Sequence, residues 1–410
     1  MSSFKNVLII GKVWPEPKSS AAGRRMMQLI DFFLSQNSKI TFATAASETG
    51  FQNNLNQTKV ECVKIELNND SFDSFMEELQ PQMVIFDRFT MEEQFAWRVS
   101  KIVPSAVRII NTEDLHFLRD AREQSVKKNL ALDESMIRTE MAMRELAAIQ
   151  RSDLSLFVSE YEVELLQENY SVPPNRMAYL PLFASKNDEI SSFENREGFM
   201  FIGNFYHAPN WDAVQILKKE IWPLIRKELP QATLSIYGAY AGKKVLDFHN
   251  EKEGFLVKGR VEDAKKVTQL ARISLVPLRF GAGIKGKIIE AMENGTPTIT
   301  TSVGSESMYS KSGFGGCIED DFKQFSQKAV LLYTDKEKWL QAQKTGFEIL
   351  SERFSKDEFY EKLRTTLDDL ALNYSEIRKN DLQFNLLNHH SLKSSMYLSK
   401  WIAEKNKTTL

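Results

Sequence analysis

The sequence predicts an α/β fold of two tandem Rossmann-like domains, and three observations carry this prediction. Short apolar runs rich in Ile, Val and Phe alternate with amphipathic helical patterns. This alternation occurs twice, on either side of a polar stretch at residues 185–198. The length of 410 residues also fits two compact domains. Strands that alternate with helices favour mostly parallel sheets with helices on both faces.

The first half, residues 1–185, is predicted to form the N-terminal domain. Its strands are expected at residues 6–11, 39–44, 60–67, 83–87, 108–112 and 154–158. Its helices are expected at residues 22–36, 71–79, 91–101 and 134–150. In the first of these helices, apolar residues recur at three- and four-residue spacing and so share one face: Met26, Leu29, Ile30 and Phe33.

The second half, residues 198–355, is predicted to form another α/β domain after a polar linker without amphipathic period. Its strands are expected at residues 199–203, 233–238, 254–259, 273–278 and 297–301. Its helices are expected at residues 211–228, 261–271, 286–294 and 322–333. A third segment, residues 356–410, is predicted to be helical and to pack back on the first domain. Because its tail is basic and contains Trp401, a helix on a membrane surface is the alternative interpretation.

Composition and charge exclude several classes of protein. The 53 basic and 55 acidic residues give a net charge of -2, whereas a dedicated nucleic-acid binder is usually basic. The two cysteines, Cys62 and Cys317, lie far apart and provide neither a disulfide framework nor a zinc site, which suits a reducing cytoplasm. No apolar run is long enough for a spanning helix, and the run at residues 7–11 is too short for a signal peptide.

The most informative stretch, residues 273–295, is an apolar strand followed by a glycine-rich turn and a helix. Glycines allow close backbone approach, and the free amides and dipole of a helix N-terminus attract an anion. Lys285 adds a positive charge within the turn. The stretch therefore predicts a phosphate or diphosphate site.

Three patterns fit this turn. Residues 281–286 read G-x-G-x-x-G with Glu306 twenty positions later, as in a dinucleotide fingerprint, although a lysine stands inside the turn. A P-loop is excluded because Ile288 lacks the hydroxyl that binds Mg²⁺. In the third pattern, Glu290 lies one helical turn after Gly286 and accepts hydrogen bonds from ribose hydroxyls while the amides hold a diphosphate.

The third pattern belongs to a series of motifs between residue 198 and about residue 308. They are Phe201-Ile-Gly203, Pro209-Asn-Trp-Asp212, Leu234-Ser-Ile-Tyr-Gly238, Val257-Lys-Gly-Arg-Val261, residues 277–288, Glu290-Ala-Met-Glu-Asn-Gly295 and Thr301-Ser-Val-Gly-Ser-Glu306. In this order and spacing, the half resembles the nucleotide-sugar-binding domain of GT-B glycosyltransferases. The resemblance is to retaining enzymes of glycosyltransferase family 4, the glycosyl transferases group 1. It implies two Rossmann-like domains that face each other across a cleft.

The resemblance also implies roles for individual residues. Glu290 matches the second Glu of the E-x7-E motif and would hold the donor ribose, and Lys285 would hold the diphosphate. Ala282 stands where many members carry the first Glu, which leaves the sugar open. The implied donor-binding residues are Gly203, Asn204, Gly238, Val261, Arg279, Gly281, Gly283, Ile284, Gly286, Gly304 and Glu306.

The N-terminal half resembles the acceptor domain of the same fold more loosely. His116 matches a histidine that holds the donor sugar in such transferases, so His116, Lys285 and Glu290 form the expected catalytic set. Gly23, Arg24 and Asp87 are expected on the acceptor side, since the carboxyl ends of parallel strands face the ligand crevice. Loops at residues 14–22 and 120–133 are expected to shape acceptor specificity.

The function implied by the resemblance is transfer of a sugar, with retention, from a nucleotide-diphosphate sugar to a carbohydrate or glycolipid hydroxyl. No Asp-x-Asp pair occurs, so we expect catalysis without a metal and without a cofactor beyond the donor. A cytoplasmic location is expected, with peripheral contact to the inner face of the membrane left open. Three alternatives stay open: a nucleotide-sugar epimerase, a non-catalytic two-domain binding protein and, more weakly, an NAD-dependent dehydrogenase. The sugar, base, acceptor, pathway and oligomeric state are not specified.

Overall fold

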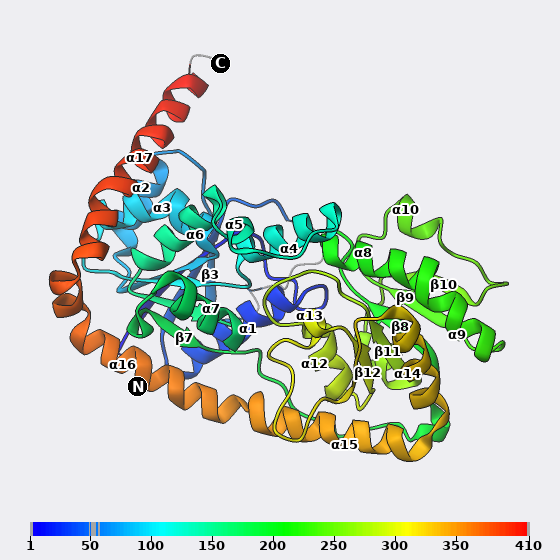
Figure 1. Cartoon of the computed structure of the whole chain (residues 1–410). Coiled ribbons are helices and arrows are strands. Elements are labelled where there is room, and N and C mark those ends of the chain that lie inside the picture. Colours follow the sequence, from blue (N-terminus) through cyan, green and yellow to red (C-terminus); the bar gives the residue numbers. More distant parts are fainter. Residues whose placement is uncertain (1–2, 49, 51–54, 56–57, 408–410) are drawn as a thin grey trace.

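The computed structural model describes residues 3–48, 50, 55 and 58–407. The first half of the chain is built on a parallel sheet of seven strands, which lies beside the second half in Figure 1. The strands pair in the order β3-β2-β1-β4-β5-β6-β7. Their bounds are β1 Asn6–Gly11, β2 Lys39–Thr44, β3 Val60–Lys64, β4 Met83–Asp87, β5 Val107–Asn111, β6 Leu154–Phe157 and β7 Met177–Tyr179. The sequence did not predict the three-residue β7, and β3 ends three residues earlier than expected.

The second half is built on a six-stranded sheet in the order β10-β9-β8-β11-β12-β13. Its strands are β8 Glu197–Ile202, β9 Leu234–Tyr237, β10 Phe255–Gly259, β11 Ala271–Val276, β12 Thr298–Thr300 and the unpredicted β13 Gly316–Ile318. All pairings between the described strands are parallel. The strand order reverses between β1 and β4 and between β8 and β11, and ligands of open α/β sheets bind at such switch points.

Helices cover both faces of the first sheet. They are α1 Ala21–Ser35, α2 Ser71–Leu79, α3 Phe89–Ile102, α4 His116–Lys128, α5 Glu134–Ile137, α6 Glu140–Gln150 and α7 Glu160–Tyr170, with a 3₁₀ turn at Pro174–Arg176. The prediction of a loop at residues 120–133 is wrong for residues 120–128, which belong to α4. The single helix expected at residues 134–150 is divided, because the side chain of Thr139 accepts from the Ala142 amide and caps α6.

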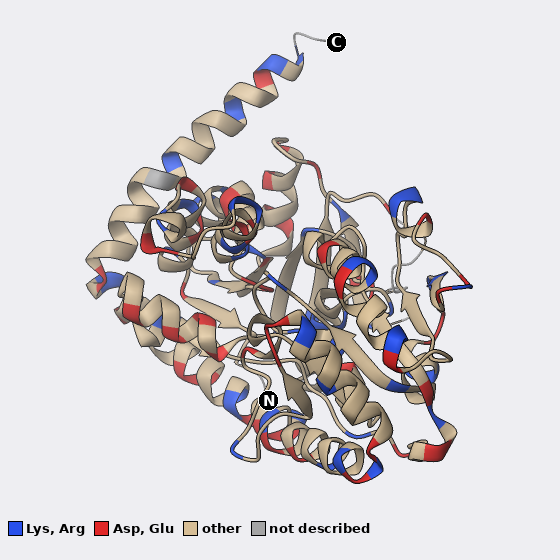
Figure 2. Ribbon diagram, turned by 45° about the vertical axis from the view of Figure 1, so that its right-hand side comes forward, with Lys and Arg blue, Asp and Glu red and all other residues tan. Residues whose placement is uncertain are grey.

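The helices of the second half are shorter. They are α8 Ala208–Ile216, a π-turn Leu217–Ile221, α9 Trp222–Glu228, α10 Lys243–Leu246, α11 Ala264–Leu270, α12 Gly286–Glu293, α13 Ser302–Ser305 and α14 Phe322–Thr334. The predicted linker contains a 3₁₀ turn, Phe193–Asn195, and leads directly into β8. Acidic and basic residues are interspersed over both halves (Figure 2).

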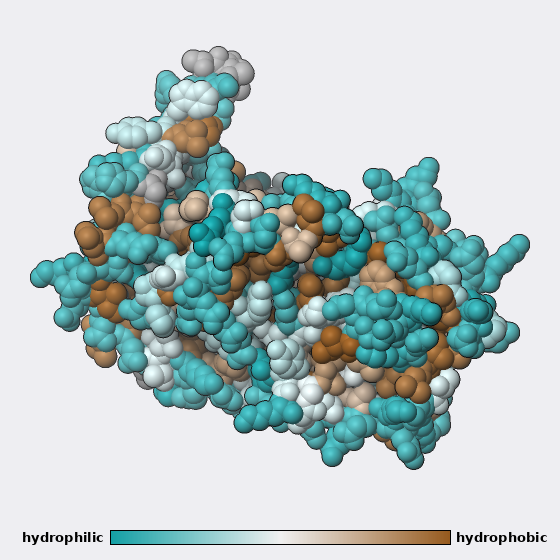
Figure 3. Space-filling model, viewed as in Figure 1, coloured by the Kyte–Doolittle hydropathy of each residue, from teal (hydrophilic) through white to brown (hydrophobic). Residues whose placement is uncertain are grey.

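Three C-terminal helices connect the two halves. They are α15 Lys336–Arg353, α16 Lys356–Asn380 and α17 Leu382–Lys407. Trp339 of α15 is buried in the core of the second half, whereas Phe359 and Leu363 of α16 are buried in the core of the first. The predicted packing of C-terminal helices on the first domain is thus confirmed. Helix α17 continues over α3 and α6, and its end projects from the body (Figures 1 and 3). No helix of the described residues has the length and apolar character needed to cross a bilayer.

Candidate active site

The glycine-rich turn lies between β11 and α12, at the carboxyl edge of the second sheet. Gly281 and Gly283 have φ angles of 145° and 66°, which side chains with a Cβ rarely adopt. A Cβ on Gly283 would lie 2.5 Å from the carbonyl oxygen of Glu113, in the first half of the chain. Glycine therefore allows the two halves to meet at this turn.

Two lysines flank the start of α12. Lys285 is 5% exposed, and its Nζ donates to the Gly283 carbonyl at 2.8 Å and lies 3.6 Å from a Glu306 oxygen. Burial lowers the pKa of Lys285. Lys287 Nζ donates to Asn210 Oδ1 at 2.7 Å, and burial and the charge of Lys285 lower the pKa of Lys287 to about 8. Lys287 is not among the residues that the sequence predicts for the site, although its position in the first turn after the glycines could have indicated it.

Glu290 follows one turn later in α12. Burial and the neighbouring Glu293 raise its pKa to about 7. Its carboxylate forms no side-chain hydrogen bond or ion pair with any residue that the structure describes, whereas Glu293 pairs with Arg24 at 2.6 Å. Glu290 is therefore available as an acceptor beside a helix N-terminus that favours negative charge.

Side chains of the first half hold the turn from the other side. Arg122 of α4 donates to the Gly281 carbonyl at 2.7 Å and to both carboxylate oxygens of Glu306 at 2.6 and 2.8 Å. Glu162 of α7 accepts from the Gly283 amide at 2.7 Å, and burial raises its pKa to about 7. The carboxylate of Glu306, a predicted donor ligand, is thus engaged in a contact between the two halves.

His116 is the first residue of α4 and lies at the carboxyl edge of the first sheet. Its Nε2 is 3.5 Å from Asp114 Oδ1, and its ring meets the Phe89 ring edge-on at a centroid distance of 5.2 Å. Burial lowers the pKa of His116 to about 3, so the ring is neutral at neutral pH. The buried carboxylate of Glu145 accepts from the Phe117 amide at 3.0 Å and fixes the start of the helix.

The predicted acceptor-side residues occupy two places. Asp87 is buried at the end of β4, where its Oδ2 accepts from the Lys12 amide at 3.1 Å. A Cβ on Gly23 would lie 2.4 Å from the Glu16 backbone, so this glycine lets residues 12–20 lie against α1. Arg24 instead points toward the second half, where it pairs with Glu293.

The other predicted donor residues are distributed along the edge of the second sheet. Gly203 and Asn204 follow β8, Gly238 follows β9, Val261 follows β10 and Gly304 lies in α13 after β12. Ile284 packs against the second core, while Ala282 packs against an apolar cluster of the first half. Arg279 pairs with Asp212, so its charge is already partnered. No group of three or more His, Cys, Asp or Glu within the described residues is placed to hold a metal ion.

Comparison with known proteins identifies the family of the second half of the chain. Residues 196–335, which include the glycine-rich turn and α12, match the family model of Glycosyl transferases group 1. The chain is a glycosyltransferase. Its two parallel sheets and C-terminal helices form the GT-B fold, and no curated protein sequence matches the chain.

Solved glycosyltransferases share this fold over nearly their whole length. HepE from Anabaena in complex with UDP and glucose has a TM-score of 0.64 and 13% identity, with 89% of this chain and 99% of HepE covered. The pneumococcal O-GlcNAc transferase GtfA in complex with UDP and GlcNAc has a TM-score of 0.66 and 13% identity, with 90% and 99% covered. WaaG, a glycosyltransferase involved in lipopolysaccharide biosynthesis, has a TM-score of 0.62 and 10% identity, with 88% and 99% covered. At these identities the similarity establishes the fold.

Proposed function

We propose that this glycosyltransferase moves a sugar from a nucleoside diphosphate sugar to a hydroxyl of a carbohydrate or glycolipid, with retention and without a metal ion. The observation that carries the proposal is the group formed by Lys285, Lys287, the N-terminus of α12 and the unpaired Glu290. HepE and GtfA were solved with UDP, which makes uridine diphosphate the first base to test.

The donor would lie along the carboxyl edge of the second sheet. Glu290 accepts hydrogen bonds from the ribose hydroxyls, and the amides at the start of α12 face the diphosphate. As the glycosidic bond breaks, negative charge grows on the leaving diphosphate. The two lysines and the helix dipole would stabilise that charge.

The first domain would supply the contacts to the sugar and the acceptor. His116 is neutral, so its ring can donate one hydrogen bond and accept another from a sugar hydroxyl. Asp87 and the loop held by Gly23 lie at the switch point between β1 and β4, where we place the acceptor. Direct contacts between the halves would limit access of water, which otherwise hydrolyses the donor.

We also propose a cytoplasmic enzyme that contacts a membrane peripherally through the end of α17. Tyr397, Leu398 and Trp401 are more than half exposed there, and Lys405 Nζ lies 5.2 Å from the centre of the Trp401 ring. Lysines and aromatic rings together favour the interface of an anionic bilayer. Co-sedimentation with phosphatidylglycerol vesicles should decrease in Trp401→Ala, and equal sedimentation would contradict this contact.

The donor assignment is tested by thermal shift with UDP, GDP, ADP, dTDP and NAD, each with Mg²⁺ and with EDTA. A ligand that binds only the native state raises the melting temperature. We expect a rise with one nucleoside diphosphate, equal in both conditions, absent in Glu290→Ala and retained in the exposed control Glu337→Ala. A rise in melting temperature with NAD alone would instead identify the glycine-rich turn as a dinucleotide-binding site. The anomeric configuration of the product, read by NMR, tests retention.

A further inference from the structure

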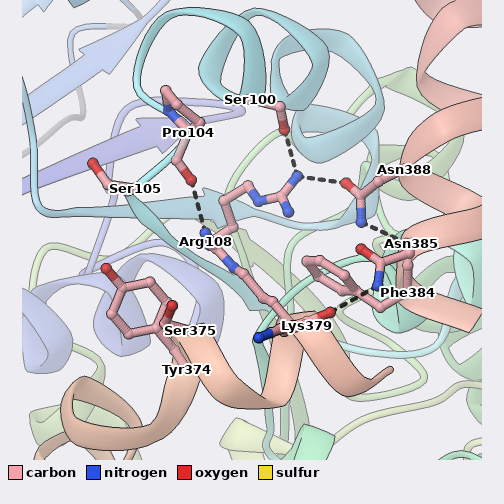
Figure 4. A pocket seen from close by; sticks show the side chains of 11 residues that line it. Ser100, Pro104, Ser105, Arg108, Tyr374, Ser375, Lys379, Phe384, Asn385 and Asn388 are labelled. Atoms are coloured by element: carbon pink, nitrogen blue, oxygen red, sulfur yellow. Dashed lines mark hydrogen bonds between the residues drawn. The ribbon is translucent and has the colours of Figure 1, made fainter. Parts of the chain in front are cut away.

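A cavity lies at the amino edge of the first sheet, between the end of α3, the start of β5 and the corner where α16 meets α17 (Figure 4). Its volume is about 540 Å³, within the range of small-molecule sites. It is lined by Ser100, Pro104, Ser105, Arg108, Tyr374, Ser375, Arg378, Lys379, Phe384, Asn385 and Asn388. The lining contains three basic residues and no acidic one.

Arg108 is the distinctive group in this cavity. It is only 5% exposed, yet it has no ion pair with any described residue. One guanidinium nitrogen donates to Ser100 Oγ and to Asn388 Oδ1, the latter at 2.7 Å. Among the described residues, no hydrogen-bond acceptor is found for its other two nitrogens, and the guanidinium carbon lies 5.2 Å from the centre of the Phe384 ring (Figure 4). A buried charge without a counter-ion is costly, so such a group calls for an anion.

The nearby carboxylates of Asp153 and Glu92 act on Arg108 electrostatically, but neither forms an ion pair with its guanidinium, because each is bound by another arginine. Arg378 also lines the cavity, and Arg151 and Arg176 contact its lining residues Asn388 and Phe384. Each of these three arginines has its own carboxylate: Arg151 pairs with Glu92, Arg176 with Asp381 and Arg378 with Asp153. Asp153 accepts from both the Nε and a terminal nitrogen of Arg378, and also from the Arg108 backbone amide. Lys379, which is exposed at the rim, has no ion pair in the described part of the chain. Two positive charges, those of Arg108 and Lys379, are therefore left over.

We propose that this cavity binds a phosphate-bearing molecule through Arg108 and Lys379. A phosphate monoester carries close to two negative charges and three acceptor oxygens, which match the two unpaired cations and the hydroxyls of Ser105 and Ser375. The planar guanidinium fork suits phosphate geometry. Because the cavity is larger than an inorganic anion requires, it has room for an attached sugar, glycerol or similar organic group.

This site is separate from the donor site. Arg108 is the second residue of β5, whereas Asn111 ends the same strand at the edge that carries His116. Three residues of strand span about 10 Å, which places the cavity on the opposite edge of the sheet. A ligand here would join α16 and α17 to β5 and fix the C-terminal helices on the first domain.

The test measures binding of inorganic pyrophosphate and of glycerol 1-phosphate to the full-length protein by isothermal titration calorimetry. Truncation of Arg108 leaves a hole in a buried region, so the decisive variant is Asn388→Asp. It puts a carboxylate where Arg108 now donates to an amide oxygen, and thereby supplies the missing counter-ion within the protein. Lys379→Glu reverses the charge at the rim. Lys323→Glu makes the same change at an exposed position of α14, outside the cavity and outside the proposed membrane contact.

We expect saturable binding that weakens at least tenfold in Asn388→Asp and in Lys379→Glu. It should persist in Lys323→Glu and in the Lys285→Ala/Lys287→Ala double variant, which tests whether the measured binding occurs at the donor site. Circular dichroism and melting curves check that Asn388→Asp folds. Binding that needs phosphatidylglycerol vesicles and is lost in Asn388→Asp assigns a lipid headgroup, and binding in free solution assigns a soluble phosphate ester. No saturable binding in either form, or equal binding by Asn388→Asp, would overturn the proposal.

Discussion

The two sheets share one strand order over six strands, yet their carboxyl edges are built differently. The second sheet presents glycines with positive φ, a helix N-terminus and two lysines, all within residues 281–290. The first presents polar side chains from separate elements, among them the buried Asp87, Asp114 and Glu162 and the half-buried His116. The same order of strands therefore supports a site made from consecutive backbone residues in the second sheet and a site made from side chains of distant elements in the first.

Loss of the two lysines should have the largest effect, since it removes the charges from the local site. A charge-assisted hydrogen bond contributes about 1.5–3 kcal/mol, so Lys285→Ala and Lys287→Ala should each lower kcat/KM roughly 10- to 100-fold. The exposed Lys311→Ala should retain wild-type kinetics. Near wild-type activity of either variant with donor below KM would show that the diphosphate lies elsewhere.

Arg122→Ala probes the contact between the two edges and should have the next largest effect. Removing one partner of a buried pair costs about 3–5 kcal/mol, and here it also releases the Gly281 carbonyl. We expect kcat/KM to fall at least tenfold and the melting temperature to fall. Arg353→Ala removes the more exposed Arg353–Glu160 pair between the same halves and should change kcat/KM less than threefold. If both variants lower kcat/KM equally, the Arg122 contact at the glycine-rich turn has no special importance for catalysis.

Several of these residues were predictable from the sequence, because their signal is local. The strands are marked by apolar runs of five or six consecutive residues. The glycine turn, Lys285 and Glu290 likewise lie within one short segment. Helix α4 was missed because its polar majority hides the apolar period, and its start depends on Glu145, which is 28 residues away from Phe117.

The contacts between the halves could not be predicted. Arg122 and Glu306 are 184 residues apart, and Glu162 and Gly283 are 121 apart, so only the folded chain brings them together. The strands β7 and β13 have three residues each and depend on a neighbouring strand rather than on their own pattern. Long-range side-chain pairs therefore define the part of the site that sequence patterns do not reach.

The pH dependence of donor binding should give a moderate effect. Glu290 has a pKa raised to about 7 by burial, so its carboxylate is lost as the pH falls below 7. Lys287 has a pKa lowered to about 8, so its charge is lost as the pH rises above 8. Donor affinity should be highest between these values and fall on both sides. Calorimetry across pH 6–9 measures it, and Glu290→Gln should remove only the acidic limb.

Gly23→Ala should have the smallest effect, confined to the first domain. Its Cβ would collide with the Glu16 backbone and displace residues 12–20. We expect the acceptor KM to rise several-fold while the donor KM stays unchanged. Gly242→Ala, where a Cβ meets nothing within 4 Å, is the matched control. If the donor KM changes instead, residues 12–20 belong to the donor site and the division of roles between the two edges is wrong.

The packing of α16 also affects how the protein is made. The core of the first domain includes Phe359, Leu363, Leu367 and Leu370, which are translated long after its last strand, β7. During translation, part of the apolar surface of the first domain therefore stays exposed until the second domain and α16 have been synthesised. Folding of the two domains is coupled in time, and the nascent chain needs protection from aggregation during this interval.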